Sequence, residues 1–334
     1  MRIVEECQVK SPFTGRKVNE IFDLEKQSFR GEDYWVHSRY YECQDTGEHF
    51  SDSAQDDFTL NDLYSQYRIR HGIPFPREIK AIRERYGLNY TQLGRILGIG
   101  VNQYAKYENG QLPSESNGRL IGAIRRKTIL LDLVENVKPI FETADFQKIV
   151  KQIQNSPDED PTENNDSIFY QGTSRSIENG YGEFNHKKVE EMVLFLAKEG
   201  TCATKLNKEM FYSDFLHFKK YGISISGLRY QAIEFGPVPV HYRTIYDNID
   251  GLEQIISLDS DHEVVKLQSD GYDPGIFSES ERSILTRIHD RLAAMTTKEV
   301  VELSHKEPAW LKNHASKSII PYSEAYLGYF SNLE

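Results

Sequence analysis

The chain has 334 residues, of which 38% are hydrophobic and 27% are charged, so we expect two or three globular domains. The sequence contains no run of about 18 apolar residues, which excludes a membrane-spanning helix, and its first residues lack the apolar core of a secretion signal. Its three cysteines exclude a disulfide scaffold and are typical of a cytoplasmic protein.

The positive charge of the chain is concentrated in one segment. The formal net charge is −11, yet residues 76–131 carry 10 Lys and Arg residues against 4 Asp and Glu residues. Residues 1–67, by contrast, carry 7 basic and 14 acidic residues. A protein that binds phosphates needs a local positive face rather than an overall positive charge. The charge distribution therefore predicts that the middle of the chain binds nucleic acid.

Residues 1–70 are predicted to form a small β-rich domain. Val18–Phe29 and Tyr34–Tyr41 are rich in aromatic and β-branched residues, and Arg30–Asp33 between them has the composition of a turn. This arrangement predicts a β-hairpin.

Two cysteines of this segment are weak candidates for a metal site. Cys7 and Cys43 each begin a pattern typical of a zinc knuckle, but Lys10 and Thr46 occupy the positions where a zinc ribbon has its second cysteines. Two thiolates would need a nearby histidine to complete a site. We expect instead a domain that keeps the shape of a ribbon and fills its centre with side chains, without a cofactor.

Residues 71–140 are predicted to form five short helices, two of which have the layout of a helix-turn-helix. In such a motif one helix crosses the DNA backbone and the next enters the major groove. Asparagine and glutamine side chains can pair with adenine, and lysine can reach guanine. The alternative is a helix cluster whose basic face is only solvated. The candidate DNA-binding residues are Gln92, Arg95, Asn102, Gln103, Lys106 and Tyr107.

The rest of the chain divides by composition. Residues 141–183 are predicted to contain a helix end and then a flexible acidic linker rich in Pro, Gly, Ser and Asn. Residues 184–334 show helical periodicity with short extended stretches, which predicts a helix-dominated α+β domain. The predicted fold class is therefore multidomain and mainly α, with a β-rich N-terminal domain.

The sequence offers no positive evidence for an enzyme. Asp214 and His217 lie one turn apart on a predicted helix, where a structural pair is more common than an acid–base pair. The surrounding aromatic stretch, residues 206–222, has the composition of a helix core. The segment Phe235–Pro239 predicts a rigid turn that is either a binding surface or a structural corner.

Residues 1–137 resemble the MqsA/YgiT-type antitoxins, through Ile79–Leu88 and Gly100–Gly110. The resemblance implies a zinc-ribbon-like domain followed by an Xre-type helix-turn-helix. It also implies that an asparagine at the start of the recognition helix and a basic residue one turn later read the operator, and these positions are Asn102 and Lys106.

Residues 184–330 resemble the Panacea, or SocA-like, domain. The resemblance rests on Leu206–Tyr212, Asp214-Phe215, Gly227–Ala232 and Phe235–Pro239. It implies a toxin-neutralising antitoxin domain. The candidate toxin-binding residues are Phe211, Tyr212, Phe215, Arg229, Tyr230, Phe235, Gly236, Pro237, Val238 and Pro239.

Together these features predict a type II antitoxin. Its C-terminal domain would bind a cognate protein toxin encoded nearby, and its helix-turn-helix would repress its own operon as a homodimer on double-stranded operator DNA. The alternative is a transcription regulator whose C-terminal domain senses a ligand or docks a protein that is not a toxin.

Overall fold

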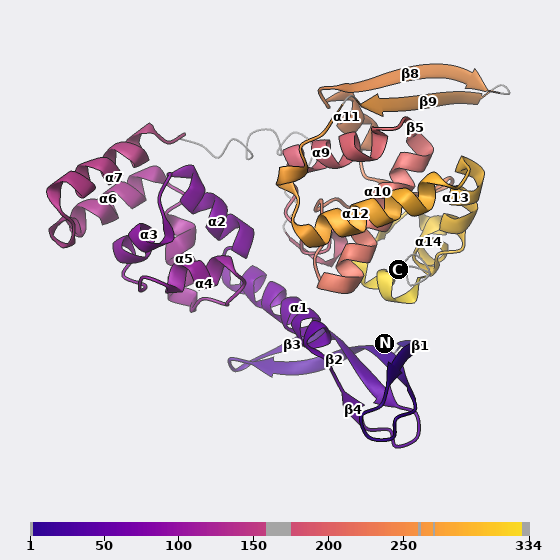
Figure 1. Cartoon of the computed structure of the whole chain (residues 1–334), viewed down its shortest axis with the longest axis horizontal. Helices are drawn as coiled ribbons and strands as arrows, with labels where there is room; N and C mark the ends of the chain where they lie inside the picture. Colours follow the sequence, from indigo (N-terminus) through magenta and orange to yellow (C-terminus); the bar gives the residue numbers. More distant parts are fainter. Residues whose placement is uncertain (1–2, 158–174, 260–261, 270, 329–334) are drawn as a thin grey trace. The chain divides into compact units, whose positions relative to one another are not determined.

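We analysed a computed structural model that describes residues 3–157, 175–259, 262–269 and 271–328 (Figure 1). The fold is multidomain and mainly α, with an N-terminal antiparallel sheet, which confirms the predicted class. Its contacts divide the chain into two compact units, Leu63–Asn164 on the one hand and Met1–Asp62 with Asn165–Glu334 on the other. In the part of the chain that the structure describes, no helix is long and apolar enough to cross a membrane.

The N-terminal segment forms an antiparallel sheet in the order β1-β2-β3-β4. Its strands are β1 (Ile3–Lys10), β2 (Lys17–Phe29), β3 (Glu32–Cys43) and β4 (His49–Phe50). The β2–β3 pair confirms the predicted hairpin, in which Phe29 pairs with Glu32. The loop residues Arg30 and Gly31 have φ angles of 51° and 84°. Positive φ at both positions is the geometry that matches the twist of paired strands.

The segment predicted to be β-rich also contains a long helix, α1 (Ser53–His71). The sequence pattern does not predict it, because the buried residues of α1 include the polar side chains of Gln55, Asp62 and Arg68. Each has partners in the fold; the Asp62 carboxylate, for example, accepts a hydrogen bond from the His37 backbone amide over 2.8 Å. The boundary between the two compact units falls inside this helix.

The sheet packs against the C-terminal part of its own unit. The ring of Phe22 on β2 stacks on Tyr326, with the ring centres 5.0 Å apart. Lys219 is buried and pairs with Glu5 over 3.1 Å. Arg39 donates to the Lys219 carbonyl oxygen over 3.1 Å. Residues from the two ends of the chain therefore share one core.

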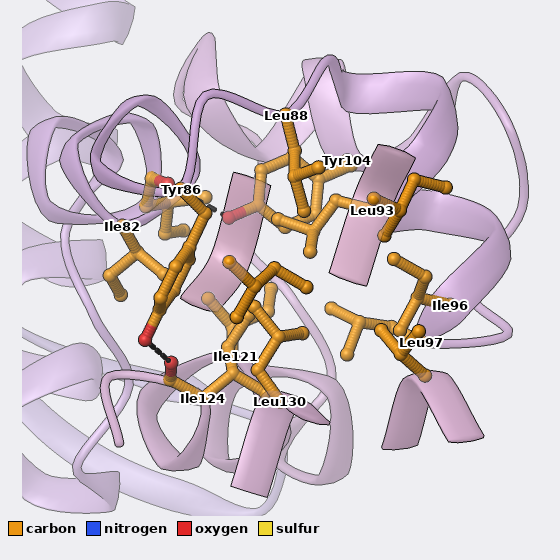
Figure 2. Packing of buried hydrophobic residues seen from close by; sticks show 14 of the residues in the cluster. Ile82, Tyr86, Leu88, Leu93, Ile96, Leu97, Tyr104, Ile121, Ile124 and Leu130 are labelled. Atoms are coloured by element: carbon orange, nitrogen blue, oxygen red, sulfur yellow. Dashed lines mark hydrogen bonds between the residues drawn. The ribbon is translucent and has the colours of Figure 1, made fainter. Parts of the chain in front are cut away.

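Residues 71–140 contain the five predicted helices: α2 (Pro76–Arg85), α3 (Tyr90–Ile96), α4 (Gln103–Glu108), α5 (Glu115–Ala123) and α6 (Lys127–Asn136). They surround one apolar core (Figure 2). Two tyrosines anchor it, since the Tyr104 hydroxyl donates to the Ile79 carbonyl over 2.8 Å and Tyr86 to that of Ile124 over 2.7 Å.

After the turn η1 (Lys138–Ile140), a further helix, α7 (Thr143–Asn155), completes this unit. It lies in the segment predicted as a helix end and linker. It buries Phe146, Ile149 and Ile153 against the core. Most of the predicted linker, residues 158–174, lies outside the described residues. Residues 175–183 include η2 (Ile177–Asn179), followed by the buried Tyr181, whose ring contacts Phe218.

The C-terminal part surrounds the long helix α10 (Ala203–Tyr221), in which every residue from Leu206 to Lys219 is buried. Two small sheets accompany it, in the orders β5-β9-β8 and β10-β6-β7. The strands are β5 (Thr201–Cys202), β6 (Tyr230–Ile233), β7 (Gly236–Pro239), β8 (Leu252–Asp259), β9 (His262–Ser269) and β10 (Ile319–Ile320). The remaining helices are α9 (His186–Ala197), α11 (Tyr242–Asp247), η3 (Pro274–Ile276), α12 (Glu279–Ala293), α13 (Thr297–His305), α14 (Pro308–Asn313), η4 (His314–Ser316) and η5 (Tyr322–Leu327).

Candidate functional site

The start of α3 is fixed by a helix cap, and the turn from α3 to α4 is fixed by a close backbone contact. The Asn89 side chain accepts from the Gln92 amide over 2.8 Å, and the Gln92 side chain accepts from the Asn89 amide over 2.9 Å. This reciprocal cap defines where α3 begins and occupies the Gln92 carbonyl oxygen. A Cβ atom at Gly94 would lie 2.7 Å from the Gly100 carbonyl oxygen. The turn therefore approaches α3 so closely that only glycine fits.

The short helix α4 displays the two residues that sequence resemblance assigns to operator reading. Asn102 precedes the helix, Lys106 follows one turn later, and both are exposed. Residues four apart lie on one helix face, so the structure brings these two side chains together. Arg95 on α3 is also exposed.

The other candidates on α4 are more enclosed. Gln103 is half-buried, and its side-chain amide donates to that of Gln111 over 3.1 Å. Tyr107 is only 4% exposed, and its hydroxyl accepts from the Asn117 side chain over 3.0 Å. Tyr107 thus belongs to the core of the helix cluster rather than to its exposed face.

An ion pair missed by the sequence analysis holds the end of α4. Arg83 on α2 donates to Glu108 over 2.5 Å, and also to the Leu88 carbonyl over 3.2 Å. The pair raises the pKa of Arg83, chiefly through the hydrogen bond to Glu108. Arg83 therefore fixes the position of α4 from inside the domain.

The aromatic candidates on α10 and β6 form a core. Phe211, Tyr212 and Phe215 on α10 and Tyr230 on β6 are fully buried. The ring of Phe215 stacks on Tyr322 with a centre separation of 4.2 Å. These four predicted toxin contacts are thus internal side chains, and their role is to support the elements around α10.

Asp214 organises the loop that follows α10. Its carboxylate accepts hydrogen bonds from the backbone amides of Ile225 and Ser226 and from the Tyr230 hydroxyl, over 2.7–2.9 Å. Burial nevertheless raises the pKa of Asp214. His217 hydrogen-bonds to the Ile223 carbonyl over 2.7 Å. Both side chains therefore bind the loop 223–226.

The turn between β6 and β7 presents one exposed aromatic ring. Ile233 pairs with Gly236, so Glu234 and Phe235 form the loop, and Phe235 is 63% exposed. Gly236 has φ +94°, and a Cβ atom there would lie 2.6 Å from the Lys208 Cε atom. The Lys208 ammonium donates to the Pro237 carbonyl over 3.0 Å. Burial lowers the pKa of this lysine to about 7.

Among the remaining candidates of this segment, Pro237, Val238 and Pro239 are buried in β7. Arg229 is partly exposed, and its guanidinium lies 3.8 Å from the Glu178 carboxylate.

Comparison with family models gives two matches. Residues 206–311 match the antitoxin SocA-like, Panacea domain, and residues 79–121 match the helix-turn-helix. The chain carries a Panacea antitoxin domain and a helix-turn-helix. The searches of curated proteins and of solved structures gave no match. These matches confirm two parts of the predicted resemblance, whereas the likeness of the N-terminal sheet to the MqsA zinc ribbon stays a prediction.

Next to the exposed Phe235, the Panacea domain has a groove of about 1180 Å³. Its walls come from the sheet β5-β9-β8, the start of α10, α11 and the connection between α12 and α13. Tyr242, Ile255 and Met295 contribute apolar surface, and Arg243 and Lys266 contribute positive charge. No sequence signal identified this groove, because its residues are scattered over about 100 positions.

The N-terminal sheet ends in two turns with the same hydrogen bonds. In the first, the Gly15 amide donates to the Ser11 carbonyl, and in the second the Gly47 amide donates to the Cys43 carbonyl, each over 2.8 Å. The equivalent of Cys43 is therefore Ser11, which corrects the prediction that Cys7 begins the first knuckle. The shared Thr-Gly ending of the two segments could have revealed this equivalence.

The two weak metal candidates have different surroundings. Hydrogen bonds from Ser11, Thr46 and Thr14 lower the pKa of Cys43 to about 6. Cys7 lies within β1, donates to the Val18 carbonyl over 3.5 Å, and has its pKa raised by burial. Within the described ranges, no group of three or more His, Cys, Asp or Glu residues could hold a metal ion.

Proposed function

We propose that this chain is a type II antitoxin that neutralises a cognate protein toxin through its Panacea domain and represses its own operon through the helix-turn-helix. The observation that carries the proposal is the presence of a Panacea antitoxin domain and a helix-turn-helix on one chain. The exposed Asn102, at the N-cap position of α4, and Lys106, in its last turn, add the side chains that major-groove reading requires.

For DNA binding, α4 would enter the major groove and Arg95 would contact the phosphate backbone. Two copies of the chain would bind a pseudo-palindromic operator with half-sites roughly 34 Å apart. The charge distribution supports binding through the helix-turn-helix unit. Residues 63–164 carry 15 basic and 12 acidic residues, whereas the remainder of the chain has a net charge of −14. The acidic unit would be repelled by phosphate, and the basic one attracted.

For neutralisation, the Panacea domain would act by binding rather than by catalysis. The acid and the histidine of α10 are engaged by internal partners: Asp214 by the loop 223–226 and Tyr230, and His217 by the Ile223 carbonyl and the Ser280 hydroxyl. This structural engagement supports a binding function.

The unit that neutralises would include the N-terminal sheet. Phe22, Arg39 and Glu5 all contact residues near the C-terminal end of α10 or in η5. A fragment beginning near residue 184 would expose this shared core, so the full chain is the appropriate reagent.

A growth assay tests the proposal. The open reading frame next to this gene is expressed alone, with the full chain, and with the double variant Asn102→Ala/Lys106→Ala. We expect the neighbour to be toxic, both versions of the chain to restore growth, and only the unmodified chain to bind the operator at fixed salt. Absence of toxicity would favour the alternative, a regulator that senses a ligand or docks a protein other than a toxin. Operator binding by the double variant would refute the DNA assignment.

A further inference from the structure

We propose that the groove beside Phe235 is the toxin-binding site, and that it accepts an acidic segment of the toxin carrying a bulky apolar side chain. This inference rests on the proposed antitoxin function and specifies where and how the partner binds.

The floor of the groove is one face of the sheet β5-β9-β8. Lys266 on β9 lies opposite both Cys202 on β5 and Ile255 on β8. Directly opposite residues on antiparallel strands point to the same face. Ile255 is 50% exposed and lines the groove together with the exposed Phe235, so the two form an apolar patch. An apolar side chain of a partner would cover Ile255.

The rim of the groove presents Phe235 on a rigid support. The loop is held from below by Lys208, through the Pro237 carbonyl, and from the side by the Trp310 indole, which donates to the Ile233 carbonyl over 2.8 Å. An exposed aromatic ring on a fixed turn loses little conformational freedom on binding. Such rings are among the residues that dominate the affinity of protein interfaces. In this proposal, the buried residues Lys208 and Gly236 contribute to toxin binding indirectly, by holding the turn that carries Phe235.

The charges of the groove oppose those of its unit. Lys205, Arg243 and Lys266 line it, against the single carboxylate of Asp247. The unit as a whole has a net charge of −14. An acidic partner would be repelled by most of this surface and attracted at the groove, which favours one docking position over others.

The dimensions favour a protein segment over a small molecule. A volume of about 1180 Å³ exceeds the range of about 300–1,000 Å³ typical of small-molecule pockets. The mixture of exposed aromatic and aliphatic side chains with flanking cations is the composition of a protein interface.

The test measures binding of the purified neighbouring gene product to the full chain. Phe235→Ala and Lys266→Glu are compared with two matched controls outside the groove lining, Leu311→Ala and Lys306→Glu. Leu311 is 50% exposed and Lys306 is exposed, so all four substitutions are on the surface. We expect Phe235→Ala to weaken binding about 30-fold and Lys266→Glu about 10-fold, with the controls within twofold. Melting temperatures verify that every variant is folded.

The outcomes separate the inference from the function on which it rests. If the unmodified chain neither binds nor neutralises the neighbouring product, the antitoxin function fails and the inference with it. If it does both, and the groove variants behave like the controls, the groove assignment alone is wrong. Loss with Phe235→Ala but not with Lys266→Glu would overturn the acidic character of the partner. Recovery of Lys266→Glu by a toxin variant with one acidic residue changed to lysine would support the assignment.

Discussion

The two helices that the sequence singles out, α4 and α10, serve function in opposite ways. The short helix α4 displays Asn102 and Lys106 and turns Tyr104 and Tyr107 into the core. The long helix α10 buries every residue from Leu206 to Lys219, and its aromatic side chains are buried up to Tyr221, which is exposed at the end of the helix. A motif on a short helix at the edge of a domain can therefore be read as a contact surface. The residues of a motif on a central helix are buried, and they act by holding neighbouring turns in place, as those of α10 do.

The largest effect should come from removing the anchor of α10. Asp214→Ala leaves the amides of Ile225 and Ser226 and the Tyr230 hydroxyl without their buried acceptor. We expect a loss of about 3–5 kcal/mol in the free energy of unfolding, because these groups stay buried. Urea denaturation measures this loss. Asp214→Asn is the control, since its carbonyl oxygen still accepts, and a smaller loss is expected. Equal stability of Asp214→Ala and the unmodified chain would contradict the supporting role of α10.

A slightly smaller effect is expected at the turn before α4. In Gly94→Ala the new Cβ atom would meet the Gly100 carbonyl oxygen, which is backbone and cannot rotate away. We expect about 1–3 kcal/mol of destabilisation and loss of operator binding. Thermal unfolding measures the loss of stability, and a titration with operator DNA measures the loss of binding. Gly122→Ala on α5 is the matched control, because its Cβ atom would be 3.6 Å from Pro74. Gains in helix propensity should leave that variant unchanged or slightly more stable.

The displayed face of α4 should affect binding without affecting stability. Asn102→Ala and Lys106→Ala are each expected to weaken operator binding by about 1–3 kcal/mol and to change stability by less than about 0.5 kcal/mol. If Lys106 contacts a phosphate, Lys106→Ala should also reduce the salt dependence of binding. Titrations at several salt concentrations distinguish the two kinds of contact. Strong destabilisation by either variant would show that α4 resembles α10 after all.

The smallest effect is a pH dependence at the support of the Phe235 turn. Burial lowers the pKa of Lys208 to about 7, below its value in the unfolded chain. The folded state therefore favours the neutral amine, so this residue makes the protein less stable as pH falls from the unfolded value toward 7. Lys208→Met should remove that contribution and flatten the stability profile between pH 7 and 10. An unchanged slope, measured by denaturation at several pH values, would exclude Lys208 as its source.

Local composition predicted the β2–β3 hairpin, and local periodicity was enough to predict the five helices of residues 71–140. It failed at α1, where Gln55, Asp62 and Arg68 lie on the buried side and remove the amphipathic pattern. The family resemblance marked Phe211 and Tyr230 as toxin contacts, yet both are fully buried, because an aromatic side chain suits a core and an interface equally well. Only the packing around α10 distinguishes the two cases.

No short stretch of the sequence predicts the groove or the core shared by the N-terminal sheet and the C-terminal residues. Lys219 meets Glu5 across more than 200 positions of sequence, and Phe235 reaches the groove together with residues of β5 and β9. Contacts of this kind follow from the path of the chain in three dimensions. A single sequence contains no local pattern from which such long-range contacts can be predicted.

The shared core also determines the order in which the two compact units can fold during synthesis on the ribosome. Residues 1–62 are synthesised first, but the Tyr326 ring that stacks on Phe22 and the Lys219 carbonyl that Arg39 contacts follow much later in the chain. The DNA-binding unit is continuous in sequence, so it can fold while the chain is still growing. The N-terminal sheet cannot complete the packing of Phe22 until Tyr326 has been synthesised. A nascent chain would therefore complete the fold of its helix-turn-helix unit before the fold of the unit that contains the Panacea domain.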